Sequence, residues 1–515
     1  MSEFLRSRKR LISILAPTLF GIFYMFLVMF NLQQSVWQGE SYGAYLTRYD
    51  AGQIWQFASD SNQPPLYFWA LKLWAHCFGR TDFAMRFMSA FCGAIALMFA
   101  YMWTKYKYGS KAAILGSLLL SFSPILVRYG REMQPFMMAL MFVFAAMYFL
   151  QLAIDNGQKR WWLVYALMVA LGLWTSYYTV FAFLAQGVYL CLVYGRTLFR
   201  RKTFWLSFAA ALLLFVPWLP SLLGQLAQRP TASAGISLAT LTDFWSQSLI
   251  YQNSVNLTAG ALLLTLAASV VLVVLAVRYR LGLRLLLCNI LVPLAVLLLL
   301  SLTPWGLSLL PQRIIYSSAS IALLGGIATV IATNELSLRL AKRRRKTPPA
   351  LWRRPRFVFA SCAVVLVATS LCGLCILQDY GNYNFDTGKR YSAKLLAQSI
   401  ASAEGTDRAP IIVESPWLYY DLSFYDTPEQ QSFFLGQNLD AKDGLLSPLR
   451  QAYFGRIDHL DKFLAQHEAV WYVGAIPAKG GDISFPLAGY TASQVLTLSY
   501  EHDGHQYEAI RFVPE

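Results

Sequence analysis

The chain has 515 residues, of which 57% are hydrophobic and only 14% are charged. Soluble proteins carry about 25% charged residues, so this composition excludes an ordinary soluble protein and indicates one that crosses a membrane many times. The formal net charge of +16 does not indicate nucleic-acid binding, because the Lys and Arg residues lie mostly in short clusters between apolar runs, as in multi-spanning membrane proteins.

Apolar runs follow one another along the first three quarters of the chain. Eleven of them are long enough, or nearly so, to cross a bilayer as a helix. They cover residues 11–32, 82–103, 112–127, 134–154, 161–175, 177–194, 204–223, 257–277, 283–303, 313–333 and 357–377. The first run has no small-residue cleavage site, so we expect it to remain as an anchor. The sequence therefore predicts a polytopic α-helical membrane protein with about eleven spans.

The basic clusters predict how this protein is oriented. Lys and Arg gather at 6–10, 105–111, 159–160, 196–202, 278–284 and 339–356. If the spans alternate, all of these segments lie on one side of the membrane, and the positive-inside rule makes that side the cytoplasm. We therefore expect a multi-pass protein of the plasma (inner) membrane in the cell envelope. Its N-terminus would be cytoplasmic and its C-terminal region extracytoplasmic.

The C-terminal region has a different composition, with more acids and no long apolar run. Its periodicity predicts helices over 389–403, 417–425 and 457–467 and strands over 410–414, 431–435 and 470–473. The runs 495–500 and 507–513 flank Asp503 and Gly504, which predicts a hairpin. We therefore expect a transmembrane domain over 1–378, with a first outer loop at 33–81, and an extracytoplasmic α/β domain over 379–515.

The first outer loop is long, and its segment 37–79 is too aromatic to be disordered. We interpret this segment as an amphipathic cap on the outer membrane surface. Glu40 lies a few residues beyond the first span, beside Trp37, where a carboxylate shielded from water could act as a general base. The alternative is that Glu40 is the polar end of an interfacial helix. Asp50 and Asp60 fit solvated cap or turn positions.

The second outer loop places three ionisable residues between two spans with almost no linker. They are Arg128, Arg131 and Glu132, within the segment SPILVRYGREMQP. Ionisable groups at the end of a span are functional candidates, and two guanidinium groups suit a phosphate or pyrophosphate headgroup. The alternative is a salt-bridged helix boundary. Arg313, at the outer entrance of a later span, could bind a lipid phosphate or extend to the membrane surface.

Other motifs give weaker signals. The five His residues show no metal-ligand spacing and no Cys/His cluster exists, so we expect no metal site in the sequence. A divalent cation remains possible as an agent that neutralises phosphate. The sequence has neither a GxxxxGK[ST] loop nor a GxGxxG loop that opens a helix after a strand, which argues against a nucleotide-driven pump.

Six segments resemble the GT-C membrane glycosyltransferases, in particular the protein-mannosyltransferase-like and aminoarabinose-transferase-like group (family 39 and relatives). They are GESYGAYL (39–46), QPPLYFWALKLWAHCFG (63–79), AMRFMSAFCG (84–93), SPILVRYGREMQPF (123–136), TSYYTVFAFLAQ (175–186) and PQRIIYSSAS (311–320). The resemblance covers about residues 10–335, and the PPLY and YGRE segments are its most specific parts.

The resemblance implies a GT-C-like bundle and an enzyme, a polyprenyl-phosphate-sugar-dependent glycosyltransferase. Such an enzyme moves a sugar, with inversion, from a polyprenyl-phosphate donor to a lipid, polysaccharide or protein acceptor on the outer face of the membrane. An acid in the first outer loop deprotonates the acceptor, and basic residues bind the lipid phosphate. The resemblance thus implies that Glu40 is the candidate base. Arg128, Arg131 and Glu132 form the second-loop site, and Arg313 binds phosphate.

The chain departs from the family pattern at three positions. Gly39, Gln63 and Gln134 stand where the family commonly has Asp, His and Arg. Either Glu40 therefore serves as the base, or Asp50 or Asp60 takes over, or activity is lost. Two other classes compete with the transferase: a transporter or flippase of lipid-linked sugar, and a non-catalytic membrane scaffold. We expect membrane lipid and the donor and acceptor as partners, and no nucleic acid.

Overall fold

The computed structural model describes the whole chain except residues 1, 31, 33–34, 201, 228–234, 304–306, 343–353, 380–392, 405–407, 437–438, 440–442, 452–454, 477–488 and 503–504. It divides into two compact units. The helical unit contains Met1–Phe30 and Arg86–Asp379, and the sheet unit contains Asn31–Met85 and Tyr380–Glu515. The sequence grouped the first outer loop with the spans, whereas the structure groups it with the C-terminal residues.

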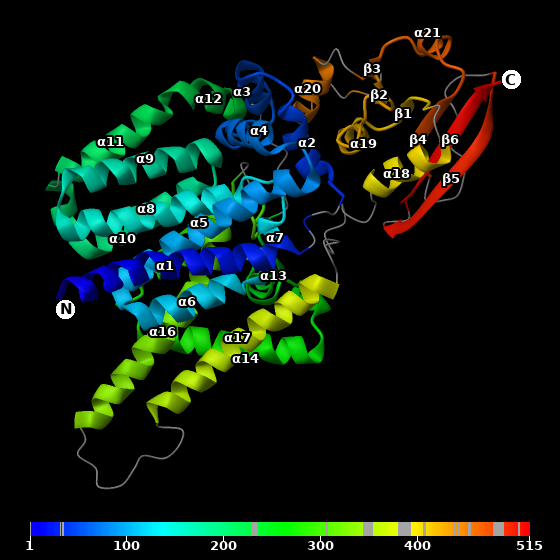
Figure 1. Cartoon of the computed structure of the whole chain (residues 1–515). Coiled ribbons are helices and arrows are strands. Elements are labelled where there is room, and N and C mark those ends of the chain that lie inside the picture. The colour runs from blue at the N-terminus through cyan, green and yellow to red at the C-terminus, as the bar shows by residue number, and fades with distance from the viewer. Residues whose placement is uncertain are drawn as a thin grey trace. The chain divides into compact units, whose positions relative to one another are not determined.

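The helical unit consists of long apolar helices that run side by side (Figure 1). They are α1 (Ser2–Met29), α5 (Asp82–Tyr108), α6 (Ser110–Ser121), α7 (Pro124–Gly130), α8 (Phe136–Asn156), α9 (Lys159–Thr175), α10 (Thr179–Tyr194), α11 (Lys202–Phe215), α12 (Leu219–Ala227), α13 (Leu238–Ile250), α14 (Ala259–Arg278), α15 (Arg284–Ser301), α16 (Ile315–Lys342) and α17 (Pro355–Asp379). Helix α8 pairs with α9, α10 with α15, and α6 with α16.

A helix lies at each of the eleven expected runs, so the prediction of a polytopic helical membrane protein is confirmed. Eight helices among the described residues are long and apolar enough to cross a membrane, or nine if α6 and α7 form one span bent by 60°. The bend has a local cause, because Pro124 begins α7 and a proline cannot donate the amide hydrogen bond that would continue α6. The described residues therefore do not establish the expected number of eleven.

Helix α13 was not expected from the sequence. Its polar residues interrupt the apolar pattern, but Ser237 and Thr240 form a capping box that starts the helix. Its side chains Phe244, Ser246, Ser248 and Ile250 are buried. It packs against α7, α16 and α17 inside the helical unit.

Helices α6 and α16 approach each other more closely than any side chain would allow. A Cβ atom added at Gly326 in α16 would lie 2.7 Å from both the backbone N and the Cα of Gly116 in α6. Small residues at such a crossing let two helix backbones come together, which is how helices gain packing energy in lipid. This contact fixes the position of α6, which leads directly into α7 and the second outer loop.

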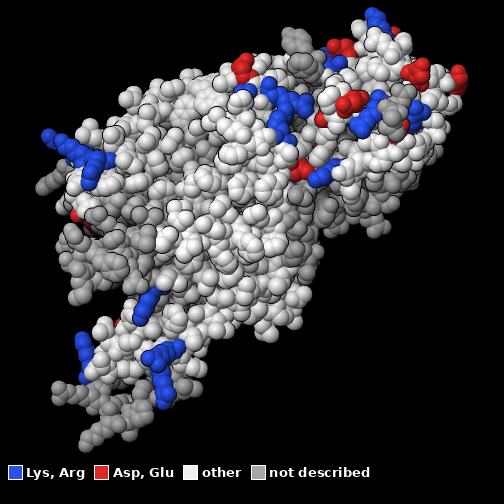
Figure 2. Space-filling model, viewed as in Figure 1, with Lys and Arg blue, Asp and Glu red and all other residues white. Residues whose placement is uncertain are grey.

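The surface of the helical unit fits a membrane environment. On the face shown in Figure 2, its middle carries almost no charged side chain, and its Lys and Arg residues gather toward the end where Figure 1 marks the N-terminus. Large apolar side chains such as Leu213, Leu263 and Val277 are exposed on its helices. Exposed apolar surface of this extent is stable in lipid and not in water.

The sheet unit holds a six-stranded sheet in the order β3-β2-β1-β4-β6-β5. The strands are β1 (Ile411–Val413), β2 (Ser432–Leu435), β3 (Arg456–Ile457), β4 (Val470–Ile476), β5 (Tyr490–His502) and β6 (His505–Pro514). Strands β1 to β4 pair in parallel, and β6 runs antiparallel to both β4 and β5. The expected α/β fold is therefore confirmed for this part of the chain.

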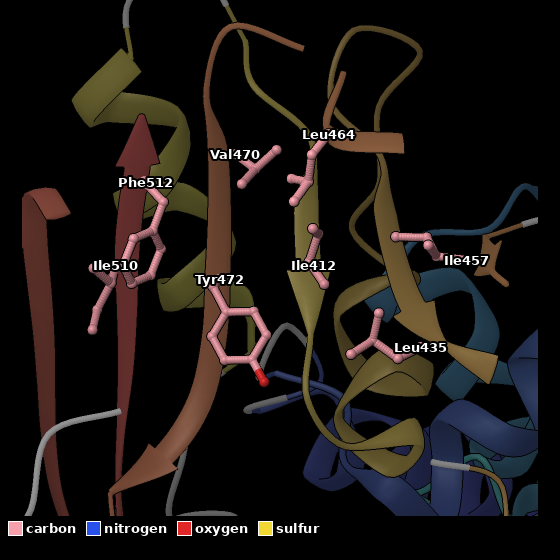
Figure 3. Packing of buried hydrophobic residues seen from close by; sticks show 8 residues of the cluster. All are labelled: Ile412, Leu435, Ile457, Leu464, Val470, Tyr472, Ile510 and Phe512. Atoms are coloured by element: carbon pink, nitrogen blue, oxygen red, sulfur yellow. The ribbon is translucent and has the colours of Figure 1, made fainter. Parts of the chain in front are cut away.

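One apolar cluster holds this sheet together (Figure 3). It consists of Ile412, Leu435, Ile457, Leu464, Val470, Tyr472, Ile510 and Phe512, all buried. Because side chains alternate between the faces of a strand, Val470 with Tyr472 and Ile510 with Phe512 share one face. Burying such side chains stabilises the sheet by about 1.5–3 kcal/mol each.

Most elements expected in the C-terminal region are present. Helices α18 (Ala393–Glu404) and α19 (Pro416–Leu422) and strands β1, β2 and β4 lie where they were predicted. Strands β5 and β6 form the expected antiparallel pair, which closes at His502 and His505, while the turn at 503–504 lies outside the described residues. The helix predicted over 457–467 was wrong at its start, because Ile457 belongs to β3 and α21 covers only Leu460–Leu464.

Candidate functional site

Glu40 lies in the first turn of α2 (Gln38–Leu46), the first helix of the sheet unit. Its side chain is completely buried. A carboxylate near a helix N-terminus interacts favourably with the helix dipole and with the free N–H groups there. A buried acid at this position differs from the solvated polar helix end that the sequence left as the alternative. The position of Glu40 fits a group that must be shielded from water.

The residue after Glu40 binds a second buried acid. The Ser41 hydroxyl donates a hydrogen bond to Oδ1 of Asp421, and both side chains are buried. Asp421 belongs to α19, 380 positions later in the chain. Burial raises the pKa of the Asp421 carboxyl well above its usual range, and the negative charge of Glu40 raises it further, whereas the Ser41 hydrogen bond lowers it.

Aromatic side chains join α2 to α19 along the same contact. The Tyr420 ring meets the Tyr42 ring edge-on at 5.9 Å and the Tyr45 ring at 5.0 Å between centroids. Nη2 of Arg48, just beyond α2, donates a hydrogen bond to the Ser423 carbonyl at 2.5 Å. Edge-to-face aromatic pairs are worth about 0.5–1.5 kcal/mol each beyond their buried area, so α2 is held firmly against α19.

Helix α19 comes directly after β1, at the carboxyl end of the parallel strands. In this sheet the chain reverses its strand order between β1 and β4, and ligands of open α/β sheets commonly bind at such a point. Here Pro416 begins α19 right after the strand, and α19 packs on α2. The carboxyl end of β1 therefore leads into α19, which packs on α2, the helix that carries Glu40.

Asp50 and Asp60, the other acids proposed for the base, have partners in the sheet unit. Asp50 caps α3 (Ala51–Asp60): its Oδ1 accepts a hydrogen bond from the Gln53 N–H, and the Gln53 side chain accepts one from the Asp50 N–H. Asp60, at the end of α3, accepts a hydrogen bond from the Ser447 hydroxyl. Asp50 therefore has a role in helix capping, and Asp60 joins α3 to the segment that contains Ser447.

A third acid of this unit, Asp426, contributes to the dependence of its stability on pH. Its Oδ1 accepts hydrogen bonds from the N–H and the hydroxyl of Ser432, at 3.0 and 2.7 Å. Burial nevertheless raises the pKa of this carboxyl from 3.8 to about 6. The folded state therefore binds the proton more tightly than the unfolded state, and the stability that this group contributes is lost as the pH rises from 3.8 to about 6.

Asp426→Asn is therefore expected to stabilise the protein at pH 7 by about 2 kcal/mol, somewhat less than 1.36 kcal/mol per pKa unit because the carboxyl is partly exposed. Below pH 4 the difference should disappear, because the native carboxyl is then protonated. Thermal unfolding of the purified full chain at pH 7 and pH 4 measures it. A variant that is less stable than the wild type at pH 7 would contradict the assignment.

The residues of the second outer loop form a buried cluster in the helical unit. Nη1 of Arg128 pairs with Oε1 of Glu132 at 2.6 Å, and both side chains are buried. Nη2 of Arg131 donates to the Leu27 carbonyl of α1 at 3.2 Å. The Nε and Nη1 atoms of Arg131 have no hydrogen-bond partner among the described residues, although the side chain is only 5% exposed. This guanidinium therefore has N–H donors with which it can bind an anion.

A tyrosine from α1, Tyr24, packs next to this cluster. The Tyr24 hydroxyl donates to the Leu126 carbonyl at 2.7 Å. A Cβ atom at Gly93 would lie 2.5 Å from the Tyr24 ring, and one at Gly130 would clash with the Tyr24 hydroxyl. Glycine at these two positions therefore lets α1 pack against α5 and α7, and it places the Leu27 carbonyl where Arg131 reaches it.

Arg313 is half-buried at the start of α16 in the same unit. Its Nη1 donates to the Ser308 hydroxyl at 2.6 Å, and its guanidinium lies 5.1 Å from the centre of the Tyr178 ring. The Tyr178 carbonyl in turn accepts a hydrogen bond from the Tyr316 hydroxyl at 2.8 Å. Arg313 is thus orientated by an aromatic face and a hydroxyl.

Among the described residues, no group of three or more His, Cys, Asp or Glu side chains could hold a metal ion.

The sequence did not indicate a role for Asp421, because its only signal was a lone acid in the aromatic segment WLYYDL. No single-sequence pattern connects that acid with Ser41.

Known proteins resemble this chain in part of its sequence and in its fold. Residues 62–220 match the model of the family described as Dolichyl-phosphate-mannose-protein mannosyltransferase. The structure is similar to the crystal structure of ArnT from Cupriavidus metallidurans in the apo state, with a TM-score of 0.60 and 15% sequence identity over 95% of this chain and 97% of that chain. The chain therefore shares the fold of this ArnT.

A second structure of the same ArnT, bound to undecaprenyl phosphate, is similar to this chain with a TM-score of 0.59, 15% identity and the same coverage of 95% and 97%. No curated protein sequence is similar enough to match. The resemblance seen in the sequence is thereby confirmed, and the similarity of fold extends beyond its residues 10–335 into the C-terminal region. The matched family segment contains Arg128, Arg131 and Glu132.

Proposed function

We propose that this GT-C protein is a glycosyltransferase that takes a sugar from a polyprenyl-phosphate carrier. The sugar goes, with inversion, to a lipid, polysaccharide or protein acceptor on the outer face of the plasma membrane. The observation that carries the proposal is Arg131, a buried guanidinium in which two donor atoms have no hydrogen-bond partner among the described residues. The family match and the fold similarity to ArnT support the transferase class.

The chemistry of the buried cluster favours a phosphate. Arg128 and Glu132 neutralise each other as an ion pair, so the charge of Arg131 is left over. An isolated buried cation is costly, and a phosphate oxyanion would offset that cost through charge-assisted hydrogen bonds, which are stronger than neutral ones. A lipid-linked phosphate suits a site in the membrane-spanning unit, where its prenyl chain can remain among apolar helices.

The transfer itself needs a base and a leaving group. In the proposed reaction Glu40 accepts the proton of the acceptor nucleophile as that atom bonds to the anomeric carbon. The bond from the anomeric carbon to the phosphate oxygen breaks, and polyprenyl phosphate leaves with its negative charge bound by Arg131 and Arg313. A single displacement of this kind inverts the anomeric configuration.

The direct test is transfer from radiolabelled polyprenyl-phosphate sugars by membranes that contain the wild-type protein. Label that appears in an acceptor fraction, and only with the protein present, supports the proposal. Label that crosses vesicle membranes while it stays on its carrier would instead identify a flippase. Binding of polyprenyl phosphate with no transfer from any donor would favour the scaffold.

Arg131→Gln is expected to weaken binding of the donor. Losing charge-assisted hydrogen bonds costs about 1.5–3 kcal/mol, so the KM for the donor and the Kd for polyprenyl phosphate should both rise by about tenfold or more. Arg131→Lys keeps the charge but not the planar fork of donors, so its donor KM should lie between those of the wild type and Arg131→Gln.

The matched control for this prediction is Arg339→Gln. Arg339 is an exposed guanidinium of the same unit, and it pairs with Glu335 at the far end of α16. Its loss should leave donor binding unchanged, because surface ion pairs contribute little. Equal donor affinity in the wild type and Arg131→Gln would remove Arg131 from the donor site.

A further inference from the structure

The C-terminal domain contributes a side chain to the segment that carries the proposed base. Ser41 follows Glu40 directly, and its hydroxyl is hydrogen-bonded to Asp421 of α19. The side chains of Glu40, Ser41 and Asp421 are all at most 1% exposed. We infer that Asp421 is a positioning residue for Glu40: through Ser41 it fixes the first turn of α2. The inference rests on the proposed function.

The positioning argument follows from where α2 is held. Beyond the Ser41 hydrogen bond, Tyr420 packs on Tyr42 and Tyr45, and the Arg48 guanidinium bonds the Ser423 carbonyl. These contacts lie on successive turns of α2, so the helix can neither rotate nor slide without breaking several of them. A base displaced by about 1 Å loses a large part of its effect. Of these contacts, Ser41 with Asp421 is the one nearest to Glu40 in the chain.

Asp421 acts on α2 through one bond, because its carboxyl oxygen accepts the hydrogen bond from Ser41. Asparagine keeps an oxygen that can accept this bond, and alanine does not.

The experiment compares Glu40→Gln, Ser41→Ala, Ser41→Thr, Asp421→Ala, Asp421→Asn and Asp426→Ala in the full-length protein. Transfer from a radiolabelled polyprenyl-phosphate sugar is measured against donor concentration. Asp421→Ala and Ser41→Ala should each lower kcat about tenfold and leave the donor KM within twofold. Asp421→Asn keeps an acceptor oxygen and Ser41→Thr keeps a hydroxyl, so both should restore kcat.

Asp426→Ala is the matched control, because Asp426 is a half-buried acid of the same domain that bonds Ser432 and not α2. It should leave kcat unchanged. An unchanged kcat in Asp421→Ala, or an equal fall of kcat in Asp426→Ala, would overturn the inference. If Asp421→Ala does not fold, as judged by thermal unfolding, an unchanged kcat in Ser41→Ala overturns it.

The same panel separates this inference from the proposal on which it rests. Full activity in Glu40→Gln would remove the base itself, whatever the other variants do. An inactive Glu40→Gln together with fully active Ser41→Ala and Asp421→Ala would leave the transferase intact and refute the positioning role alone.

Discussion

Glu40→Gln is expected to lower the rate of sugar transfer by at least about 100-fold, because a positioned general base contributes about 10²–10⁴-fold to a reaction. The substitution keeps the size of the side chain and removes its ability to take a proton. Binding of polyprenyl phosphate should be unchanged, because the guanidinium groups proposed for it are untouched. The measurements are transfer of labelled sugar in membranes and binding of labelled polyprenyl phosphate to the purified protein.

The controls for this result are Asp50→Asn and Asp60→Asn. An asparagine at position 50 can still cap α3, since its side-chain oxygen accepts the same hydrogen bond, so Asp50→Asn should transfer at the wild-type rate. Asp60→Asn should do the same, because an amide oxygen can still accept from Ser447. If Glu40→Gln were fully active and one of these two variants inactive, the base would be that aspartate.

Gly326→Ala should be one of the most destabilising single-methyl additions in the chain. The added Cβ would lie 2.7 Å from backbone atoms of Gly116, and a helix backbone cannot move aside as a flexible side chain can. Overpacking of this kind costs about 1–3 kcal/mol and more where the neighbour is rigid, so we expect about 3 kcal/mol. Thermal unfolding of the protein in detergent should show a clear fall in Tm.

Gly187→Ala is the appropriate comparison for that experiment. Gly187 lies inside α10, and a Cβ atom there would meet no other atom within 4 Å. Alanine has a higher helix propensity than glycine by about 1 kcal/mol, so this variant should be as stable as the wild type or more so. An equal Tm for Gly326→Ala and Gly187→Ala would show that the helices α6 and α16 can separate at little cost.

The sequence located the helices of this protein well, because a membrane makes each spanning segment continuously apolar. The sequence did not predict α13, because Thr240, Asp243 and Gln247 break the apolar pattern of this half-buried helix. Arg128 and Glu132 are four positions apart, so their ion pair was open to prediction from helical spacing. The capping box of Asp50 and Gln53 also has a local signature.

The environment of Glu40 could not be predicted in this way. Its neighbour Ser41 bonds a residue 380 positions away, and one sequence carries no record of such a contact. The prediction of a helix at Ile457 failed for a different reason. Its short run has apolar residues at the spacing of a strand and also at that of a helix, so it fits both elements equally well. Local chemistry was therefore predictable in this chain, whereas the pairing of its two distant segments was not.

The division of the sheet unit between two distant segments has a consequence for synthesis. Ser41 leaves the ribosome 380 residues before Asp421, a delay of roughly 20–80 s at about 5–20 residues per second. During that time α2 has no α19 against which to bury Tyr42 and Tyr45. The nascent chain must keep this aromatic helix from aggregation or proteolysis until every intervening span has been inserted. The first loop thus reaches its final structure only when translation has almost ended, so that a truncated product never acquires an assembled site.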